Sequence, residues 1–295
     1  NVFEHFFVKT YEFNKTHMSK ISAAITAVGA YVPEFVLTNA MLENMVETND
    51  EWITTRTGIK ERRILKAEGK GTSFLAIKAA QNLIQKASLD PATIDLVIVA
   101  TATPDMKAAS TASYTSTQIG ATNAFSYDMD SACSSFLFGM SVAARYIESG
   151  AYKKVLLIGA DKNSSMIDYT DRATCIIFGD GAGAAVLSRC EEKGKGILSS
   201  HLHSEGKHAK ELVLEGPSTQ RWVPEIIENN DPDDVSYYPY MNGQFVFKHA
   251  VTRFSEAIVE GLAANNLGKE DIDMLIPHQA NLRIAQFIQK KFSLT

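Results

Sequence analysis

Apolar residues along the chain fall into short continuous runs that alternate with helical repeats, a pattern that predicts an α/β fold. Residues 94–100 and 155–159 are continuous apolar runs, typical of strands buried on both faces of a parallel sheet. Residues 21–30 predict a further strand, and residues 73–87 carry apolar side chains at helical spacing. We therefore expect a largely parallel sheet that is covered by helices.

The periodicity changes within residues 125–140, FSYDMDSACSSFLFGM. Residues 125–129 alternate as a strand does, and residues 136–147 are apolar nearly all round, which predicts a buried helix. Cys133 lies at the junction, among small residues that leave room for an acyl group. Because the positive end of a helix favours a thiolate, we expect a lowered pKa and a nucleophilic role for Cys133. A small buried cysteine is the alternative interpretation.

The stretch NDEWITTRTGIKERR, residues 49–63, contains an aromatic residue and ends in a charged run. Trp52 and Arg56 are four residues apart, so a helix would place them on one face. We interpret KERR as a solvated edge. Thr38 or Asn39 is expected to cap an earlier short helix.

Two later segments contain features that resemble binding sites. Residues 173–188 predict two strands joined by GDGAG, but the segment lacks the full GxGxxG spacing, so tight turns explain its glycines better than a phosphate cradle does. Residues 199–243 hold several prolines and little periodicity, which predicts a long surface excursion or lid. His201, His203 and His208 begin it, yet no carboxylate or cysteine at ligand spacing completes a set, so we expect no metal site.

An internal repeat divides the chain. Residues 267–276, LGKEDIDMLI, match residues 89–98, LDPATIDLVI, at a constant offset of 178 (267 − 89), and a helix is predicted before each copy. The repeat predicts two similar α/β halves, residues 18–193 and residues 194–295.

The repeat also bears on the two ends of the chain. Residues 1–17 are interpreted as a tail or a remnant of cloning, because Met18 has the character of a natural start. A full copy of the first half would continue for roughly 70 residues past Thr295, so we expect the second half to be incomplete at its C-terminus.

A second stretch with chemical character is IPHQAN, residues 276–281, between a predicted strand and a predicted helix over residues 282–292. Loops at the carboxyl ends of parallel strands are where α/β sheets place their chemistry, so His278 is a candidate site residue. His249 lies within a helical run and is interpreted as structural.

Composition narrows the classes of function. The hydrophobic content of 45% is enough for a substantial core, and a net charge of −5 without a basic stripe argues against a nucleic-acid partner. No apolar run reaches the length of a membrane span. Three cysteines without a CxxC pair suggest neither a disulfide framework nor a zinc knuckle, and a reducing cytoplasm fits them.

Four separated motifs together resemble one family, β-ketoacyl-acyl-carrier-protein synthase III, the initiating condensing enzyme of bacterial fatty-acid synthesis. The motifs are DSACSSF at 130–136, NDEWITTRTGI at 49–59, TDRATCIIFGDGAGAAVL at 170–187 and PHQANLRI at 277–284. The resemblance covers about residues 18–295. It implies the thiolase-like five-layered α-β-α-β-α fold of two duplicated halves, assembled as a homodimer, with the second half incomplete at its C-terminus.

The resemblance implies a ping-pong acyltransferase. Cys133 would be the acylated nucleophile, with its own backbone N–H helping to hold the thioester oxyanion. His278 would donate a hydrogen bond to the carbonyl oxygen of malonyl-carrier protein as it loses carbon dioxide. The family's third catalytic residue, an Asn of an NTxAA-type loop, has no counterpart before Thr295. We therefore expect a chain restricted to these residues to be poorly active or insoluble.

The resemblance also implies where coenzyme A binds. Trp52 and Arg172 would sandwich its adenine, and Arg56 would meet its phosphates. Asn281 and Gly243 would line the pantetheine tunnel.

The remaining expectations concern partners. Phe247 would support the active site, and Arg283 with nearby basic residues would receive the acyl-carrier protein. Acetyl-CoA is the expected acyl donor, and no permanently bound cofactor and no metal are expected.

Three alternatives stay open. Residues 104–113, PDMKAASTAS, occupy the stretch that shapes the primer pocket in the family, so a related synthase could use a longer or branched primer. A non-catalytic acyl-CoA-binding scaffold would not need both Cys133 and His278. A cysteine protease would leave the coenzyme A motifs unexplained.

Overall fold

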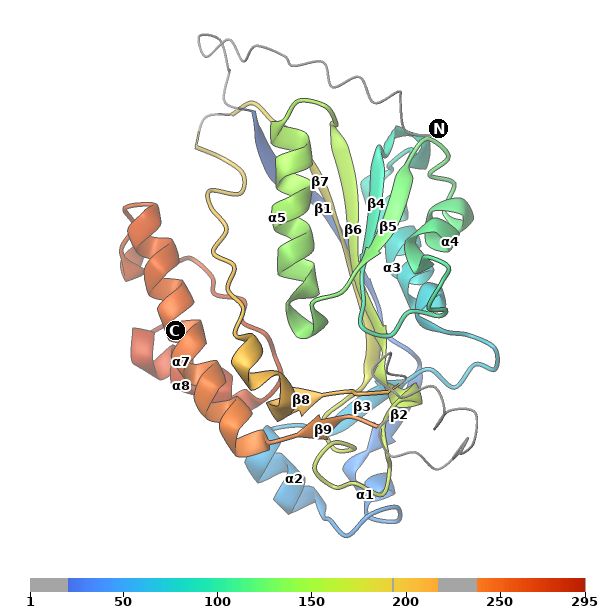
Figure 1. Ribbon diagram of the computed structural model, residues 1–295, viewed down its shortest axis with the longest axis vertical. Helices are drawn as coiled ribbons and strands as arrows, with labels where there is room; N and C mark the ends of the chain where they lie inside the picture. Colours follow the sequence, from blue (N-terminus) through green and yellow to red (C-terminus); the bar gives the residue numbers. More distant parts are fainter. Residues whose placement is uncertain (1–20, 193, 217–237, 295) are drawn as a thin grey trace, which may run out of the picture.

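A mixed five-stranded sheet with helices on both faces organises the computed structural model, which describes residues 21–192, 194–216 and 238–294 (Figure 1). The strands are β1 (Ser22–Tyr31), β2 (Phe35–Thr38), β3 (Glu61–Ile64), β4 (Leu96–Ala100), β5 (Phe125–Met129), β6 (Lys154–Lys162), β7 (Asp180–Cys190), β8 (Leu212–Val213) and β9 (Tyr240–Met241). The helices are α1 (Asn39–Leu42), α2 (Asp50–Thr57), α3 (Thr72–Ala87), α4 (Thr111–Gln118), α5 (Ser135–Glu148), α7 (Gly243–Ala264) and α8 (Leu282–Phe292). Short 3₁₀ turns are η1 (Pro91–Thr93), η2 (Ala132–Ser134), η3 (Asn163–Ser165), η4 (Gly206–Glu211) and η6 (Lys269–Asp271).

The strand order is β1-β7-β6-β4-β5. Strand β4 runs parallel to both β5 and β6, so that Ile98 lies opposite Tyr127 on one side and Leu157 on the other. Strand β7 is antiparallel to β1 and β6, which makes the sheet mixed rather than purely parallel. Because β4, β5 and β6 share one direction, their carboxyl ends meet at a single edge, where such sheets place ligands and catalytic groups.

Alternate residues of the central strands supply two cores, one on each face of the sheet. Val97 and Val99 pack with the buried side of α3, including Leu83. Leu96 and Ile98 point to the other face and pack under α5. The predicted helix over residues 73–87 and the predicted buried strand are thereby confirmed.

Helix α5 buries only the side that faces the sheet. Gly139 lies so close to the sheet that an added Cβ would be 2.6 Å from Cδ1 of Leu157. Leu137, by contrast, is 60% exposed. The prediction of a helix buried all round is therefore wrong for the described residues, because the sheet covers one side alone.

A third apolar cluster joins the two-stranded β2–β3 sheet to α1 and α2. Thr38 caps α1 by accepting from the N–H of Met41, as the sequence predicts. Arg62, within KERR, is buried and donates to the backbone carbonyl of Ile176 and to Oδ1 of Asn39. The interpretation of KERR as a solvated edge is wrong at this position, because successive side chains of β3 point to opposite sides.

Two predicted strands are not observed. Residues 173–178 form turns, and the single strand β7 begins only at Asp180. Residues 272–276 do not pair with any described strand, and Met274 and Ile276 are 77% and 79% exposed. The local repeat is nevertheless preserved, because η6 begins at Lys269, 178 positions after Pro91 of η1.

Helices α7 and α8 lie together beside the sheet, next to the small β8–β9 hairpin (Figure 1). Residues 217–237 of the predicted surface excursion lie outside the described residues, as do residues 1–17 of the predicted tail. None of the described helices combines the length and the apolar character that crossing a bilayer requires.

Candidate active site

Cys133 lies at the junction between strand and helix, as the sequence predicts. Strand β5 ends at Met129, η2 carries Cys133, and α5 begins at Ser135. The residue is exposed and its thiol is free. The sulfur therefore stands at the carboxyl edge of the sheet, in a turn that precedes the helix rather than in its first turn.

The backbone before Cys133 is strained. Ala132 has a φ of 46°, in the left-handed region that residues other than glycine rarely adopt. Three hydrogen bonds hold it: the N–H of Ala132 donates to Oδ1 of Asp130 at 2.9 Å, the N–H of Ser131 donates to Oγ of Ser135 at 2.6 Å, and that Oγ donates to the carbonyl of Ala132 at 2.7 Å. Such strain persists where surrounding bonds enforce it, and here it presents a potential nucleophile.

The pKa of the Cys133 thiol is raised, whereas the sequence predicts a lowered value. Desolvation is the largest cause, and the negative charge of Asp161 adds to it. The N–H of Cys133 itself opposes both by favouring the thiolate. Water reaches part of the residue. The surrounding protein nevertheless removes enough solvent from the thiol to outweigh the effect of the positive helix end on its pKa. The expectation of a ready-made thiolate is therefore wrong, and the resting group is a thiol.

Asp161, near the end of β6, is a site residue that sequence reasoning missed. Its Oδ1 accepts from Oγ1 of Thr101 at 3.0 Å, from the N–H of Ala102 at 2.9 Å and from Oγ1 of Thr103 at 2.9 Å. Desolvation nevertheless raises the pKa of this carboxyl. A carboxylate directly after an apolar strand is the signal that could have found it.

His278 lies in the loop between η6 and α8, and it is exposed. Desolvation lowers the pKa of its imidazole, so the ring is neutral at pH 7. In the described part of the chain no hydrogen bond joins His278 to Cys133, so their encounter stays a prediction.

Trp52 carries two guanidinium groups against its ring. The Cζ atoms of Arg56 and Arg172 lie 4.3 Å and 4.5 Å from the ring centroid. Arg56 reaches Trp52 along α2, which confirms the predicted shared face, and Arg172 arrives from a distant turn, where it also donates to the carbonyl of Glu47 at 3.1 Å. Asn49 caps α2 through the N–H of Trp52 at 2.7 Å, which fixes the start of the helix.

Helix α8 joins its site residues to α2. Oδ1 of Asn281 caps α8 by accepting from the N–H of Arg283 at 2.8 Å, and Nδ2 of Asn281 donates to the carbonyl of Arg56 at 3.0 Å. Gly58, with a φ of 76°, ends α2 against Leu282, where an added Cβ would lie 2.5 Å from Cβ of that leucine. The end of α2 and the start of α8 are thus in contact at this point.

Two further predicted site residues, Arg283 and Phe247, lie near the same contact. The Cζ atom of Arg283 lies 5.4 Å from the ring centroid of Phe247, a residue of α7. Gly243 is the first residue of α7. The structure therefore brings the Trp52 group, Asn281, Arg283 and Phe247 into one region.

GDGAG has a structural role through its aspartate. Asp180 is buried, its Oδ2 accepts from the N–H of Leu65 and from Oγ of Ser164, both at 2.7 Å, and its Oδ1 accepts from the N–H of Ser164 at 2.9 Å. These bonds tie β7 to β3 and η3. The carboxylate of Asp180 places negative charge within the GDGAG segment, and this charge would repel a phosphate.

The three histidines at 201–208 separate into two groups. His201 and His203 both contact the carboxylate of Glu260, at 3.1 Å and 2.6 Å. His208 lies instead beside His249 of α7, with ring centroids 4.7 Å apart. The sequence offers no carboxylate at ligand spacing, but folding brings one to each group, Glu260 to the first and Glu205 to the second.

The sequence and the fold were compared with known proteins. The profile of 3-oxoacyl-[acyl-carrier-protein] synthase III matches residues 127–206, and its C-terminal profile matches residues 262–295. The chain is similar to β-ketoacyl-[acyl-carrier-protein] synthase III of Porphyromonas gingivalis, with 47% identity over 94% of this chain and 81% of the relative. It is equally similar to synthase III 1 of Bacteroides thetaiotaomicron, with 47% identity over 94% of this chain and 81% of that protein.

Solved structures agree with the sequence matches. The 3-oxoacyl-[acyl-carrier-protein] synthase III of Aquifex aeolicus has a TM-score of 0.82 at 38% identity, covering 92% of this chain and 82% of its own. The corresponding synthase of Thermus thermophilus has a TM-score of 0.82 at 41% identity, with 92% and 81% covered. A priming β-ketosynthase of the R1128 polyketide pathway has a TM-score of 0.80 at 30% identity, with 92% and 79% covered.

Proposed function

The chain belongs to the 3-oxoacyl-[acyl-carrier-protein] synthase III family, and on that premise we propose that Cys133 carries the acyl group in its reaction. It has the thiolase-like fold and is a condensing acyltransferase of the kind that initiates fatty-acid synthesis. Cys133 attacks the thioester of acetyl-CoA, which gives an acetyl-enzyme and free coenzyme A. Malonyl-carrier protein then loses carbon dioxide, and its enolate carbon attacks the acetyl group to give acetoacetyl-carrier protein.

The observation that carries this proposal is the strained turn at Cys133. Ala132 is held at positive φ by its neighbours, and the thiol behind it is free and exposed. A non-catalytic scaffold has no reason to maintain such strain at this residue. The turn therefore favours the enzyme over the scaffold alternative.

His278 is proposed to act as a neutral hydrogen-bond donor. Its lowered pKa keeps the imidazole uncharged at pH 7. A preorganised donor of this kind stabilises the enolate oxygen that develops as malonyl-carrier protein loses carbon dioxide. Because the resting thiol of Cys133 is protonated, acylation also requires that its proton be taken up as the sulfur attacks.

Trp52, Arg172 and Arg56 are proposed to bind the nucleotide end of coenzyme A. A base that is stacked between Trp52 and a guanidinium needs about 7 Å between the indole and the guanidinium, because each of the two stacking contacts takes about 3.5 Å. Arg172 stands only 4.5 Å from the indole, so it has to swing outward to admit adenine. Arg56 also lies over the indole, 4.3 Å from the ring centroid, and its charge suits phosphate.

The pantetheine arm is proposed to pass Asn281 and Gly243, with Phe247 supporting the inner end. The proposed halves, residues 18–193 and 194–295, both contribute to this path. Its support is the hydrogen bond from Asn281 to Arg56, which joins one half to the other.

The primer is proposed to lie toward the loop after β4. A cavity of about 320 Å³ is lined there by Met106, Ala108, Ala109 and other residues of the loop, and by Asp130 of the nucleophile turn. Its small side chains leave the acyl length open between acetyl and longer or branched primers. Single-turnover acylation of Cys133 with acetyl, isobutyryl and octanoyl thioesters distinguishes these alternatives.

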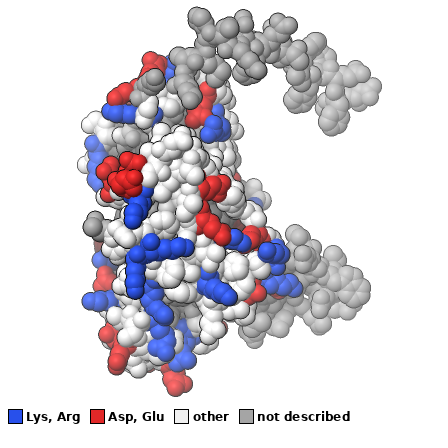
Figure 2. Space-filling model, turned by 90° about the vertical axis from the view of Figure 1, so that its left-hand side faces the viewer, with Lys and Arg blue, Asp and Glu red and all other residues white. Residues whose placement is uncertain are grey.

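The acyl-carrier protein is proposed to dock at α8. This helix presents Arg283 at its start and Lys290 and Lys291 in its last turn. Figure 2 shows Lys and Arg side chains gathered over the lower half of the face on the side of α7 and α8. Such a surface suits an acidic partner that delivers a phosphopantetheine arm.

A homodimer is proposed through the edge of the sheet at β5. This strand ends the strand order, and Phe125 is 40% exposed within a group that includes Tyr127, Tyr146 and Tyr152. An exposed strand edge beside aromatic side chains is suited to pairing with a second copy. We place the protein in the cytoplasm, because the reaction requires Cys133 as a free thiol.

Intact-protein mass spectrometry after incubation with acetyl-CoA tests the central step. The enzyme gains one acetyl group that is absent from Cys133→Ala. A chain that binds acetyl-CoA but gains no acetyl mass would instead be the scaffold.

A further inference from the structure

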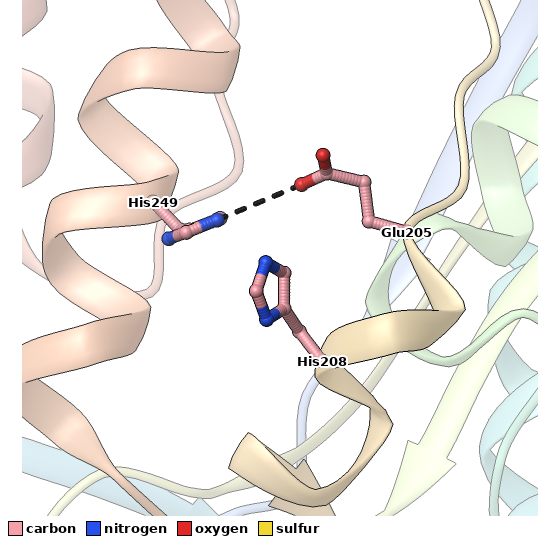
Figure 3. Close-up of side chains that lie close together, drawn as sticks. All are labelled: Glu205, His208 and His249. Carbon is pink, nitrogen blue, oxygen red and sulfur yellow. Dashed lines mark ion pairs between the residues drawn. The ribbon is translucent and has the colours of Figure 1, made fainter.

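Two histidines and a glutamate that the acyl-transfer reaction does not use come together at the contact between η4 and α7 (Figure 3). Glu205 precedes η4, His208 lies within it, and His249 projects from α7. One ligand atom from each residue lies within 4.8 Å of the other two. Nε2 of His249 lies 3.6 Å from Oε2 of Glu205.

The local backbone explains why Glu205 and His208 share one side. Residues three apart eclipse each other in a 3₁₀ turn, and the N–H of His208 donates to the carbonyl of Glu205 at 3.1 Å. His249 is oriented by Phe245, whose ring stacks on the imidazole at 4.2 Å. The three side chains are therefore positioned by the backbone turn and by packing.

We propose that Glu205, His208 and His249 bind a divalent transition-metal ion of the zinc type, which fastens the η4 turn to helix α7. Two imidazoles and one carboxylate are ligands that Zn²⁺ accepts, with bonds of about 2.0–2.2 Å. Ligand atoms around such an ion are about 3.4 Å apart, so the side chains have to close by roughly 1 Å. This ion would be structural, and it takes no part in acyl transfer.

The surroundings leave room for the remaining coordination position. A cavity of about 280 Å³ opens beside the cluster, lined by His208, His249, Glu211 and Arg253 among others. Water can fill it and complete the coordination of an ion held by three protein ligands.

Arg253 competes with the ion for Glu205. Its guanidinium donates to both carboxylate oxygens, at 2.5 Å and 3.1 Å, and Lys207 stands 3.6 Å away. A carboxylate has about four acceptor positions, so Glu205 can serve Arg253 and an ion together. The positive charge of Arg253 still weakens cation binding. Removing this charge should therefore strengthen zinc binding, whereas removing a ligand should weaken it.

Zinc affinity is measured on the whole chain by competition with a chromogenic chelator. We expect one Zn²⁺ per chain, and at least tenfold weaker binding in each of Glu205→Gln, His208→Gln and His249→Gln. His201→Gln and His203→Gln are matched controls, because these histidines contact Glu260 instead, and they should bind as the parent does. Arg253→Gln should bind zinc more tightly than the parent.

Two further measurements separate ligand loss from unfolding and from cysteine binding. Circular dichroism of the metal-free variants should match the parent, and zinc should raise the melting temperature of the parent but not of His208→Gln. With Co²⁺ the spectrum should lack the thiolate charge-transfer band, and Cys133→Ser should bind as the parent does. Binding that is insensitive to the three ligand variants, or that is lost with His201→Gln or His203→Gln, overturns the proposal.

Discussion

The side-chain amide of Asn281 donates to the backbone carbonyl of Arg56 at 3.0 Å while its oxygen caps helix α8. A single residue thus fixes the start of the helix that follows His278 and ties that helix to the end of α2. The position of the candidate hydrogen-bond donor and that of the Trp52 plate depend on the same side chain.

Replacing Asn281 should therefore lower stability and loosen the site. For Asn281→Ala we expect the free energy of unfolding to fall by about 1–2 kcal/mol, the usual effect of losing an N-cap. Asn281→Asp retains the cap acceptor and loses only the donor to Arg56, so it should recover most of that loss. Urea unfolding of the three proteins measures both effects, and equal losses in Ala and Asp would show that the cap contributes nothing.

The strained turn predicts a sharp difference between small residues at position 132. Ala132→Gly adopts a φ of 46° without strain and should acylate at Cys133 about as fast as the parent. Ala132→Val places a branched side chain in the left-handed region, at a cost of about 1–3 kcal/mol. We expect at least tenfold slower acylation by acetyl-CoA in the valine variant, measured by the rate of mass gain. A valine variant as fast as glycine would mean that the turn does not position the sulfur.

Asp161 should contribute to the ionisation behaviour of Cys133, after desolvation, which is the larger cause of its raised pKa. Its negative charge raises the pKa of the thiol, so Asp161→Asn should shift that pKa downward. The rate of alkylation by iodoacetamide, followed against pH, reports the thiolate, and its rise should begin at lower pH in the variant. Asp273→Asn removes an exposed carboxylate that does not act on Cys133 and is the control. An unchanged profile in Asp161→Asn would contradict the assignment.

His278 should separate the two half-reactions. His278→Ala should still form the acetyl-enzyme, because Cys133 is the group that is acylated. Condensation with malonyl-carrier protein should fall by about 100-fold or more, the usual effect of removing a donor to a developing oxyanion. Mass spectrometry follows the first step and release of carbon dioxide follows the second, and loss of both steps in parallel would assign His278 to acylation instead.

The lowered pKa of His278 also predicts a pH dependence of stability. Below the unfolded pKa of about 6.5 the unfolded chain binds a proton that the folded chain resists, so stability falls with acid. His278→Gln removes this contribution. The parent should therefore lose more of its unfolding free energy than the variant between pH 8 and pH 5.5, and equal losses would show that His278 is not desolvated.

Trp52 should affect KM only for acyl donors that carry the adenine nucleotide. Trp52→Ala should raise KM for acetyl-CoA about tenfold, because stacking and cation–π contacts of this kind contribute about 1–2 kcal/mol. Acetyl-pantetheine lacks adenine, so its KM should not change. A similar rise for both donors would mean that the substitution disturbs the site as a whole.

Local periodicity predicted the elements whose side chains pack against the sheet. The helix that Asn281 caps and the junction at Cys133 lie where the sequence places them. Strand assignment failed at residues 173–178, because an apolar run is equally suited to a buried turn, which here fills the cluster around Ile53. A strand also needs a paired neighbour, which residues 272–276 do not have among the described residues.

What the sequence did not reveal depends on contacts between distant residues. The helix end suggested a thiolate at Cys133, but desolvation and the charge of Asp161 act through the fold. His208 and Glu205 alone do not make a ligand set, and His249, which the sequence assigns to a structural role, completes it from another element. Local sequence carries no measure of such distances.

The parallel strands β4, β5 and β6 end at one edge, and Ala100, Met129 and Lys162 are their last residues. The loop that borders the 320 Å³ cavity and the turn that carries Cys133 therefore lie beyond the ends of these strands, outside the packed interior. Because the primer is proposed to lie in this cavity, substitutions in residues 104–110 should change which acyl group is accepted while the packed interior stays unchanged. Such a division lets a lineage explore new substrates without risking the integrity of its scaffold.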